Sequence, residues 1–289
     1  PVLEEGLAKG YDFDRVGGGA LLAILANSTD TNIIARSSRE RQLALTEELK
    51  ALLAQTPYPD KDALAALDDR FIAENLSPGG SADLLALTCP DVVREIHEKY
   101  LAAGADIIET DSFNANAVSL ADYGLEGCAY EIARAAAGVA RAAADAFTAR
   151  NPLKPRFVAG SIGPTNRTLS MSADVNDPAA RDITFAEMCA AYREQVRGLL
   201  DGGADLLLIE TVFDTLNAKA ALAAVDDECR TRGIRTPVMI SGTLSDASGR
   251  TLSGQTVEAF YASVAHARPL SVGLNCAYGA KQLLPYLER

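Results

Sequence analysis

The sequence is poor in the residues and runs that mark a disulfide scaffold or a membrane span. It contains no tryptophan, two histidines and five cysteines among 289 residues. The cysteines, at positions 89, 128, 189, 229 and 276, form no Cys-x-x-Cys pair and no compact disulfide framework. No apolar run reaches the roughly 18 residues of a membrane span. The acidic start of the chain lacks the basic-then-apolar order of a signal peptide. These absences predict a reduced, cytoplasmic protein outside the membrane.

Basic charge is also scarce. The 27 lysines and arginines are outnumbered by 39 aspartates and glutamates, which gives a formal net charge of −12. Because a nucleic-acid-binding protein normally presents a basic face, this composition argues against a nucleic-acid partner. The apolar share of 48% is ordinary for a globular protein. The length allows one large domain or two modest ones.

The pattern along the chain changes near residue 88. Residues 1–87 read as helical, and 39–55 is amphipathic, with leucines on one stripe and charged residues opposite. After that point, short apolar runs alternate with long alanine-rich helical segments. The expected strands are 105–110, 156–161, 204–211, 237–243 and 270–276. This alternation predicts parallel βα units of an α/β fold in residues 88–289, behind an all-α segment in residues 1–87.

Three of the expected strands end in residues that can carry chemistry. Glu109 and Glu210 each stand in a strand-ending Glu-Thr pair. The carboxyl ends of parallel strands are where α/β enzymes build their sites, so these carboxylates could bind an ammonium group or act as a base. Alternatively, they cap a helix or pair with arginine. Cys276 could ligate zinc or act as a nucleophile, or it could be a small buried apolar residue. Zinc normally needs three protein ligands, and the sequence offers no obvious second or third.

The helical segment has candidates of its own. Asp30 and Asn32 lie in the polar stretch STDTN, and Gly79, Gly80 and Asp83 lie in SPGGSADLLA. The acidic residues could hold a metal–nucleotide complex, with the glycines letting phosphate approach the backbone. The same residues could equally cap helices around a turn.

Several long motifs of residues 83–289 occur in the order of one known family. They are DLLALTCPDVVREIHEKYLAAGADIIETDSFNANAVSLADYGLE, VAGSIGPTNRTLSMSADVNDP, GGADLLLIETVFDTLNAKAA, and PVMISGTLSDASGRTLSGQT followed by GLNCAYGA. On these motifs the chain resembles the homocysteine-binding domain of cobalamin-dependent methionine synthase. The resemblance implies a (β/α)₈ barrel of the TIM type. In that family homocysteine, bound as a thiolate on zinc, accepts a methyl group from methylcobalamin, an external donor.

The resemblance also implies roles for individual residues. By position, Cys276 would be a zinc ligand, Glu210 would hold the substrate amino group, and Glu109, Asp111 and Asn275 would lie around the pocket. Asp111 stands where we expect asparagine. The family's other two zinc ligands, a Cys-Cys pair on its last strand, are not in the sequence, and neither is its first strand. We therefore expect a partial barrel of about five strands with open edges that allow self-association, weak zinc binding and little turnover.

Residues 1–87 carry a second resemblance. The stretches GGGALLAILANSTDTNIIARSS and LDDRFIAENLSPGGSADLLALT are similar to the C-terminal end of triphosphoribosyl-dephospho-CoA synthase, an all-helical enzyme that uses ATP and dephospho-CoA. This implies an alternative site for ATP with magnesium at the five residues named above. The two resemblances meet at ADLLALT, as in a chimera. The sequence thus supports three interpretations: an impaired homocysteine S-methyltransferase module, an ATP-dependent transferase remnant, or a non-catalytic chimeric or designed scaffold.

Overall fold

Five parallel strands form one sheet in the part of the chain that the structure describes. The computed structural model describes residues 5–6, 8–11, 13–27, 38–74, 85–172, 174, 176–245 and 248–288. The strands are β1 (Ile107–Glu109), β2 (Phe157–Ile162), β3 (Leu206–Val212), β4 (Val238–Gly242) and β5 (Ser271–Leu274). Each overlaps a segment that the sequence predicted as a strand. Each pairs in parallel with the next, in the spatial order β1-β2-β3-β4-β5.

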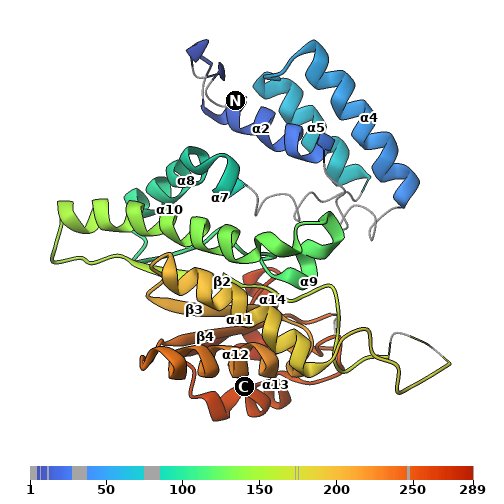
Figure 1. Ribbon diagram of the computed structural model, residues 1–289, viewed down its shortest axis with the longest axis vertical. Coiled ribbons are helices and arrows are strands. Elements are labelled where there is room, and N and C mark those ends of the chain that lie inside the picture. The colour runs from blue at the N-terminus through green and yellow to red at the C-terminus, as the bar shows by residue number, and fades with distance from the viewer. Residues whose placement is uncertain are drawn as a thin grey trace.

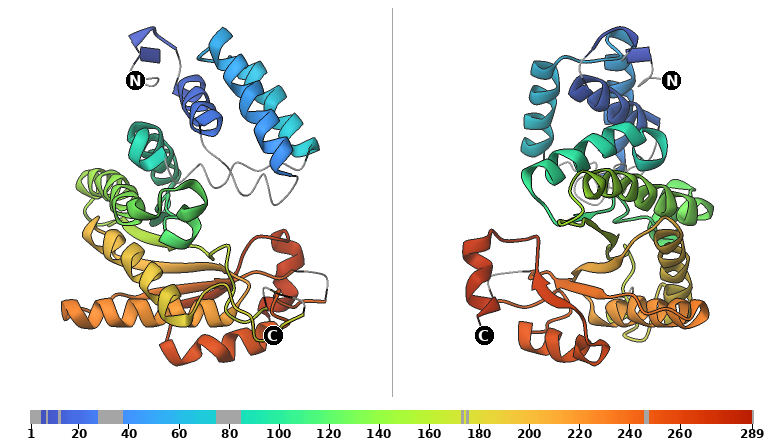
Figure 2. Two further views of the ribbon diagram at one scale, coloured as in Figure 1. Left: turned by 45° about the vertical axis from the view of Figure 1, so that its right-hand side comes forward. Right: turned by 90° about the vertical axis from the view of Figure 1, so that its left-hand side faces the viewer.

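This strand order is that of a barrel segment rather than a doubly wound sheet. Right-handed crossovers that always step in one direction place every connecting helix on the same face of the sheet, whereas a doubly wound sheet reverses direction. The helices around the sheet are α8 (Pro90–Ala103), α10 (Ala129–Arg150), α11 (Phe185–Asp201), α12 (Thr215–Arg232) and α13 (Val257–Val264). Figures 1 and 2 show α10, α11 and α12 side by side along one face. The expected partial (β/α)₈ fold is confirmed.

Local signals in the sequence set the ends of these helices. α11 begins with a reciprocal capping box, in which the Thr184 hydroxyl accepts from the Glu187 N–H and the Glu187 carboxylate accepts from the Thr184 N–H. Asp214 directly precedes α12, and its carboxylate caps the helix; Gly233 directly follows it, with a left-handed φ of 66°.

The two faces of the sheet differ in what covers them. Residues facing the helices are fully buried in the main core or in a smaller core beside it, among them Val158, Leu207 and Ile240. The opposite, inner face carries a small cluster made of Ala159, Leu206, Leu208 and Met239. On that same face Ile107 and Phe157 remain 41% and 42% exposed. The inner face is therefore only partly covered.

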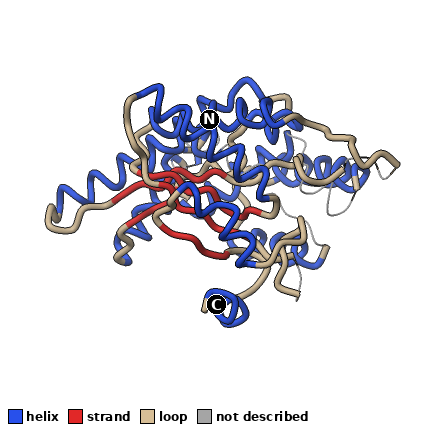
Figure 3. The backbone as a smooth tube through the Cα atoms, turned by 90° about the horizontal axis from the view of Figure 1, so that it is seen from below, coloured by secondary structure: helices blue, strands red, loops and turns tan. Residues whose placement is uncertain are grey.

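Shorter elements complete the region around the sheet. They are α9 (Ala117–Leu120), the 3₁₀ turns Ala121–Tyr123, Glu126–Cys128 and Ala265–Ala267, and α14 (Ala280–Leu287). α14 follows β5 and lies apart from the layer formed by α10, α11 and α12 (Figures 2 and 3). None of the helices in the described part of the chain is long and apolar enough to cross a membrane.

The described residues ahead of the sheet form helices, as the sequence predicted. They include α2 (Phe13–Asn27), α4 (Arg39–Gln55), α5 (Lys61–Ala73) and α7 (Leu85–Thr88). The first three share a core that includes Leu22, Leu25, Leu45, Leu49 and Phe71. A second cluster joins α2 to α8 through Val16, Ala20, Tyr58, Cys89 and Val92. Among the N-terminal elements, α2 and the turn at Tyr58 therefore pack onto the start of α8, the first helix of the sheet region (Figure 1).

Candidate functional site

Polar side chains gather at the carboxyl ends of the strands. Glu109 ends β1, Glu210 lies near the end of β3, and Asn275 and Cys276 directly follow β5. Because all the strands are parallel, these ends meet at one edge of the sheet. The structure brings Glu210, Asn275 and Cys276 together through side-chain contacts.

A β-bulge in β3 shapes this edge. Ile209 pairs with Ile240 and Val212 pairs with Gly242, so three steps along β3 match two along β4. Within the bulge Thr211 has a φ of 57°. A left-handed conformation is costly for a β-branched residue and persists only where the surroundings hold it.

The Asn275 side chain holds the bulged residue. Its Oδ1 accepts from the Thr211 backbone N–H at 3.2 Å, and its Nδ2 donates to the Thr211 Oγ1 at 2.7 Å. Because a backbone N–H can only donate, this contact also fixes which way the amide points. The same Nδ2 lies 3.3 Å from Oε2 of Glu210 and 3.7 Å from Sγ of Cys276. One amide thus links the carboxylate of β3 to the thiol after β5.

The second oxygen of Glu210 has its own donor. The Ser161 hydroxyl on β2 donates to Oε1 at 2.5 Å. Burial raises the pKa of Glu210, the hydrogen bond from Ser161 lowers it, and the nearby charge of Glu109 raises it further. Glu210 is therefore a carboxylate held at both oxygens in a partly buried site.

Glu109 and Asp111 lie at the same edge but differ from Glu210. Glu109 is exposed, although partial desolvation still raises the pKa of its carboxyl. Asp111 is half-buried, and burial raises its pKa to about 7. Among the described residues no hydrogen-bond donor contacts Asp111. A buried carboxyl with no donor favours its neutral form.

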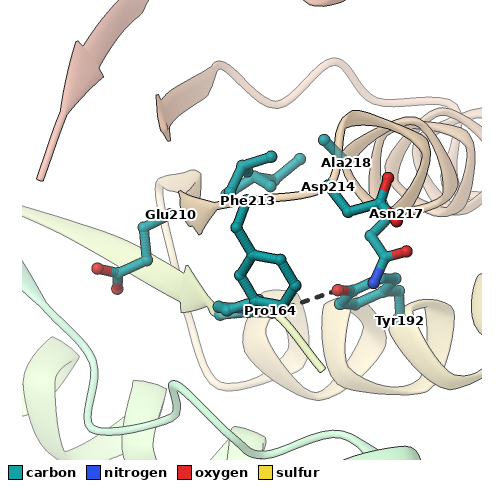
Figure 4. Close-up of a pocket in the computed structure, with 10 residues that line it drawn as sticks. Pro164, Tyr192, Glu210, Phe213, Asp214, Asn217 and Ala218 are labelled. Carbon is teal, nitrogen blue, oxygen red and sulfur yellow. Dashed lines mark hydrogen bonds between the residues drawn. The ribbon is translucent and has the colours of Figure 1, made fainter. Parts of the chain in front are cut away.

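A small pocket lies behind Glu210, on the side away from its carboxylate (Figure 4). Phe213 lies between Glu210 and the pair Tyr192 and Asn217, and the Tyr192 hydroxyl donates to the Gly163 carbonyl at 3.4 Å. The loop that contains Leu169 and Ser170 is hydrogen-bonded to the start of α12. The Asp214 carboxylate accepts from the backbone N–H groups of Leu169 at 3.1 Å and Ser170 at 2.8 Å.

Sequence reasoning did not single out Ser161, Thr211, Ser241 or Asp214. The Ser241 Oγ lies 3.1 Å from the Asn275 Oδ1, and so supports the same amide. Thr211 carried a signal, because it belongs to the repeated Glu-Thr ending, and Asp214 carried one as a helix cap. Ser161 and Ser241 lie in expected strands and in two of the family motifs, but the sequence assigned neither residue a role.

The sequence model of the family described as homocysteine S-methyltransferase matches residues 43–289. The chain belongs to this family. It also matches three structures of the homocysteine methyltransferase MmuM from Escherichia coli. The metallated form is 26% identical with a TM-score of 0.58, and the match covers 73% of this chain and 71% of that chain.

The other two structures of MmuM match this chain with similar identity and coverage. The oxidized form is 27% identical, with a TM-score of 0.55 over 73% of this chain and 70% of that chain. The apo form is 25% identical, with a TM-score of 0.55 over 72% of this chain and 69% of that chain. The expected homocysteine S-methyltransferase character is confirmed at the level of the family. The family match begins at residue 43, upstream of the residue 83 from which the motifs were recognised.

The residues around Cys276 do not complete the metal site that this resemblance implied. Cys276 is an exposed free cysteine. Across the described residues no group of three histidine, cysteine, aspartate or glutamate side chains could hold a metal ion. Because zinc normally takes at least three protein ligands, these residues alone do not fit a zinc site.

The alternative nucleotide site cannot be placed in this fold. Asp30, Asn32, Gly79, Gly80 and Asp83 all lie outside the described residues. Their role in binding ATP with magnesium, the resemblance of residues 1–87 to triphosphoribosyl-dephospho-CoA synthase, and a chimeric origin of the chain stay predictions.

Proposed function

We propose that this chain is a homocysteine-binding module that presents the thiol of homocysteine to an external methyl donor, in the manner of methionine synthase. The observation that carries the proposal is the Asn275 amide, which links the Glu210 carboxylate to the Cys276 sulfur. A carboxylate acceptor beside a thiol-lined, partly open edge suits a small amino acid that carries both an ammonium group and a sulfur atom.

The proposed reaction is a single methyl transfer to the thiol of homocysteine. A lone pair on the substrate sulfur, after loss of the thiol proton to solvent, forms a bond to the methyl carbon of the donor. The bond between that carbon and the leaving group breaks, and its electron pair stays with the leaving group. Methylcobalamin is the donor that the sequence motifs suggest. The part played by this chain is to bind and orient the substrate, with Glu210 receiving the ammonium group and Glu109, Asp111 and Asn275 shaping the pocket.

Equilibrium binding tests this proposal without requiring turnover. Isothermal titration calorimetry of the whole chain with L-homocysteine should show saturable binding. Glu210→Gln should weaken it by roughly 10-fold or more, because a charge-assisted hydrogen bond contributes about 1.5–3 kcal/mol. Glu131→Gln, an exposed position on α10, is the matched control and should bind like the parent. Failure of the parent chain to bind homocysteine, or equal binding by Glu210→Gln, would overturn the proposal.

A further inference from the structure

We propose that Ser161 is a positioning residue that aims Glu210 at the substrate ammonium group and so makes the site selective for thiols that carry one. This inference rests on the proposed function. Ser161 is 2% exposed and lies on the inner face of β2. It pairs in register with Leu208, two residues before Glu210, which places its hydroxyl beside the Glu210 carboxylate.

The backbone of Ser161 is fixed on both sides. Its N–H donates to Oγ1 of Thr110 at 2.9 Å. Its carbonyl accepts from Oγ of Ser112 at 2.8 Å and from Nε2 of Gln195 at 3.3 Å. These partners are themselves buried, with exposures of 5% for Thr110 and 0% for Ser112 and Gln195.

The directions of these hydrogen bonds are determined. The Ser112 hydroxyl donates its single hydrogen to the Ser161 carbonyl. In the 2.7 Å contact between Oγ1 of Thr110 and Oγ of Ser112, the Thr110 hydroxyl is therefore the donor, while its oxygen accepts from the Ser161 N–H. Both backbone groups of Ser161 are thus hydrogen-bonded within the network, and its side-chain hydroxyl donates to Glu210. All of these hydrogen bonds are buried.

The Ser161 hydroxyl also affects the ionisation of Glu210. Among the described residues no lysine or arginine contacts Glu210, and the acidic groups at the same edge are the carboxyls of Glu109 and Asp111. Burial and the charge of Glu109 therefore disfavour ionised Glu210, while donation from Ser161 favours it. Removing the donor leaves Asn275 alone on the other oxygen. The carboxyl is then held at one oxygen only, and its pKa rises. Glu210 therefore stays protonated up to a higher pH, where it no longer offers a charged acceptor to an ammonium group.

The experiment compares Ser161→Ala with Ser119→Ala. Ser119 is a matched control, because its Oγ is also buried and has no partner among the described residues. Calorimetric titrations from pH 5 to pH 8 would use L-homocysteine and its des-amino analogue 4-sulfanylbutanoate. For Ser161→Ala we expect homocysteine binding about 10-fold weaker at pH 7, an acidic limb of the binding profile shifted to higher pH, and unchanged binding of the analogue. Ser119→Ala should match the parent in all three measurements.

The outcomes distinguish the positioning role of Ser161 from the proposed homocysteine-binding function. If the parent binds homocysteine and Ser161→Ala binds it with the same affinity and pH profile, the inference fails and the proposed function stands. Equal weakening toward homocysteine and the analogue also overturns it, because that is the result of a general structural defect. If the parent binds no homocysteine, the proposed function fails and the inference with it. Should Ser161→Ala not fold, Thr110→Val removes the acceptor for the Ser161 N–H and should shift the same pH profile in the same direction.

Discussion

Two titratable side chains, the half-buried Asp111 and the buried His97, should contribute to the pH dependence of stability in opposite directions. Asp111 lies at the site edge with a pKa raised by burial, and His97 lies in α8 with a pKa lowered by burial. Neither Asp111 nor Nε2 of His97 has a hydrogen-bond partner among the described residues. In each case the fold favours the neutral form of the group.

For Asp111 the folded pKa of about 7 lies above the ordinary value of 3.8. Between these values the unfolded chain binds fewer protons than the folded one, so the free energy of unfolding falls as pH rises from about 4 to about 7. Asp111→Asn cannot ionise and should exceed the parent in stability at pH 8 by about 1 kcal/mol or more. Urea unfolding at pH 5 and pH 8 measures this. Asp69→Asn, an exposed position on α5, should leave the pH dependence unchanged. An Asp111→Asn curve parallel to the parent's would contradict the prediction.

For His97 the sign is reversed. Its folded pKa lies below the ordinary value of 6.5, so as pH falls through 6.5 the unfolded chain takes up a proton that the folded chain resists. Stability should therefore decrease with acidification in this window. His97→Leu should flatten the fall between pH 7 and pH 5 in thermal unfolding. His266→Leu, in the turn after α13, serves as the comparison because it changes the other histidine. If both variants lose stability with acid as the parent does, another group is responsible.

At the scale of elements, close packing of α2 depends on glycine. A Cβ added at Gly19 would lie 2.6 Å from the carbonyl oxygen of Pro57, which is backbone and cannot easily move. Gly138 is also inside a helix, α10, but a Cβ there would meet nothing within 4 Å.

The two glycines therefore predict opposite effects of the same substitution. Gly19→Ala should destabilise the protein by about 1–3 kcal/mol, because overpacking outweighs the better helix propensity of alanine. Gly138→Ala should stabilise it by about 0.5–1 kcal/mol, because propensity acts alone there. Denaturant unfolding of both variants measures the difference. A gain in stability for Gly19→Ala would mean that α2 does not pack against the Pro57 turn as described.

Elements were more predictable from the sequence than the site was. The five strands are short apolar runs between helical segments, and that contrast depends only on neighbouring residues. The bulge at Thr211 is a one-residue slip between β3 and β4, and it leaves no compositional trace. The Thr110–Ser112–Ser161 network joins residues about 50 positions apart, and Gln195 reaches it from α11. Such contacts exist only after the strands are in register, so the sequence named Glu210 and Asn275 but not the hydroxyl that orients the carboxylate.

At the scale of the whole molecule, the sheet is one part of a barrel with a partly covered inner face. Ile107 and Phe157 expose apolar surface there, and β1 and β5 have no further strand beside them in the described sheet. The carboxyl edge of the same sheet gathers polar residues from β1, β2, β3 and β5. The substrate contacts proposed for this chain therefore depend on strands that the described sheet contains.

Metal binding is where this partial barrel should differ most from a complete site. Because Cys276 is the single cysteine side chain that the described residues bring to this edge, we expect zinc to be lost on dialysis, leaving well under one ion per chain. Native mass spectrometry with elemental analysis reports zinc content and oligomeric state together. Any weak zinc uptake should disappear in Cys276→Ser and persist in Cys128→Ser. One tightly held zinc ion per monomer would contradict this expectation and require further ligands around Cys276. Tight zinc found only in an oligomer would instead place those ligands on a second copy of the chain, brought together at the open sheet edges.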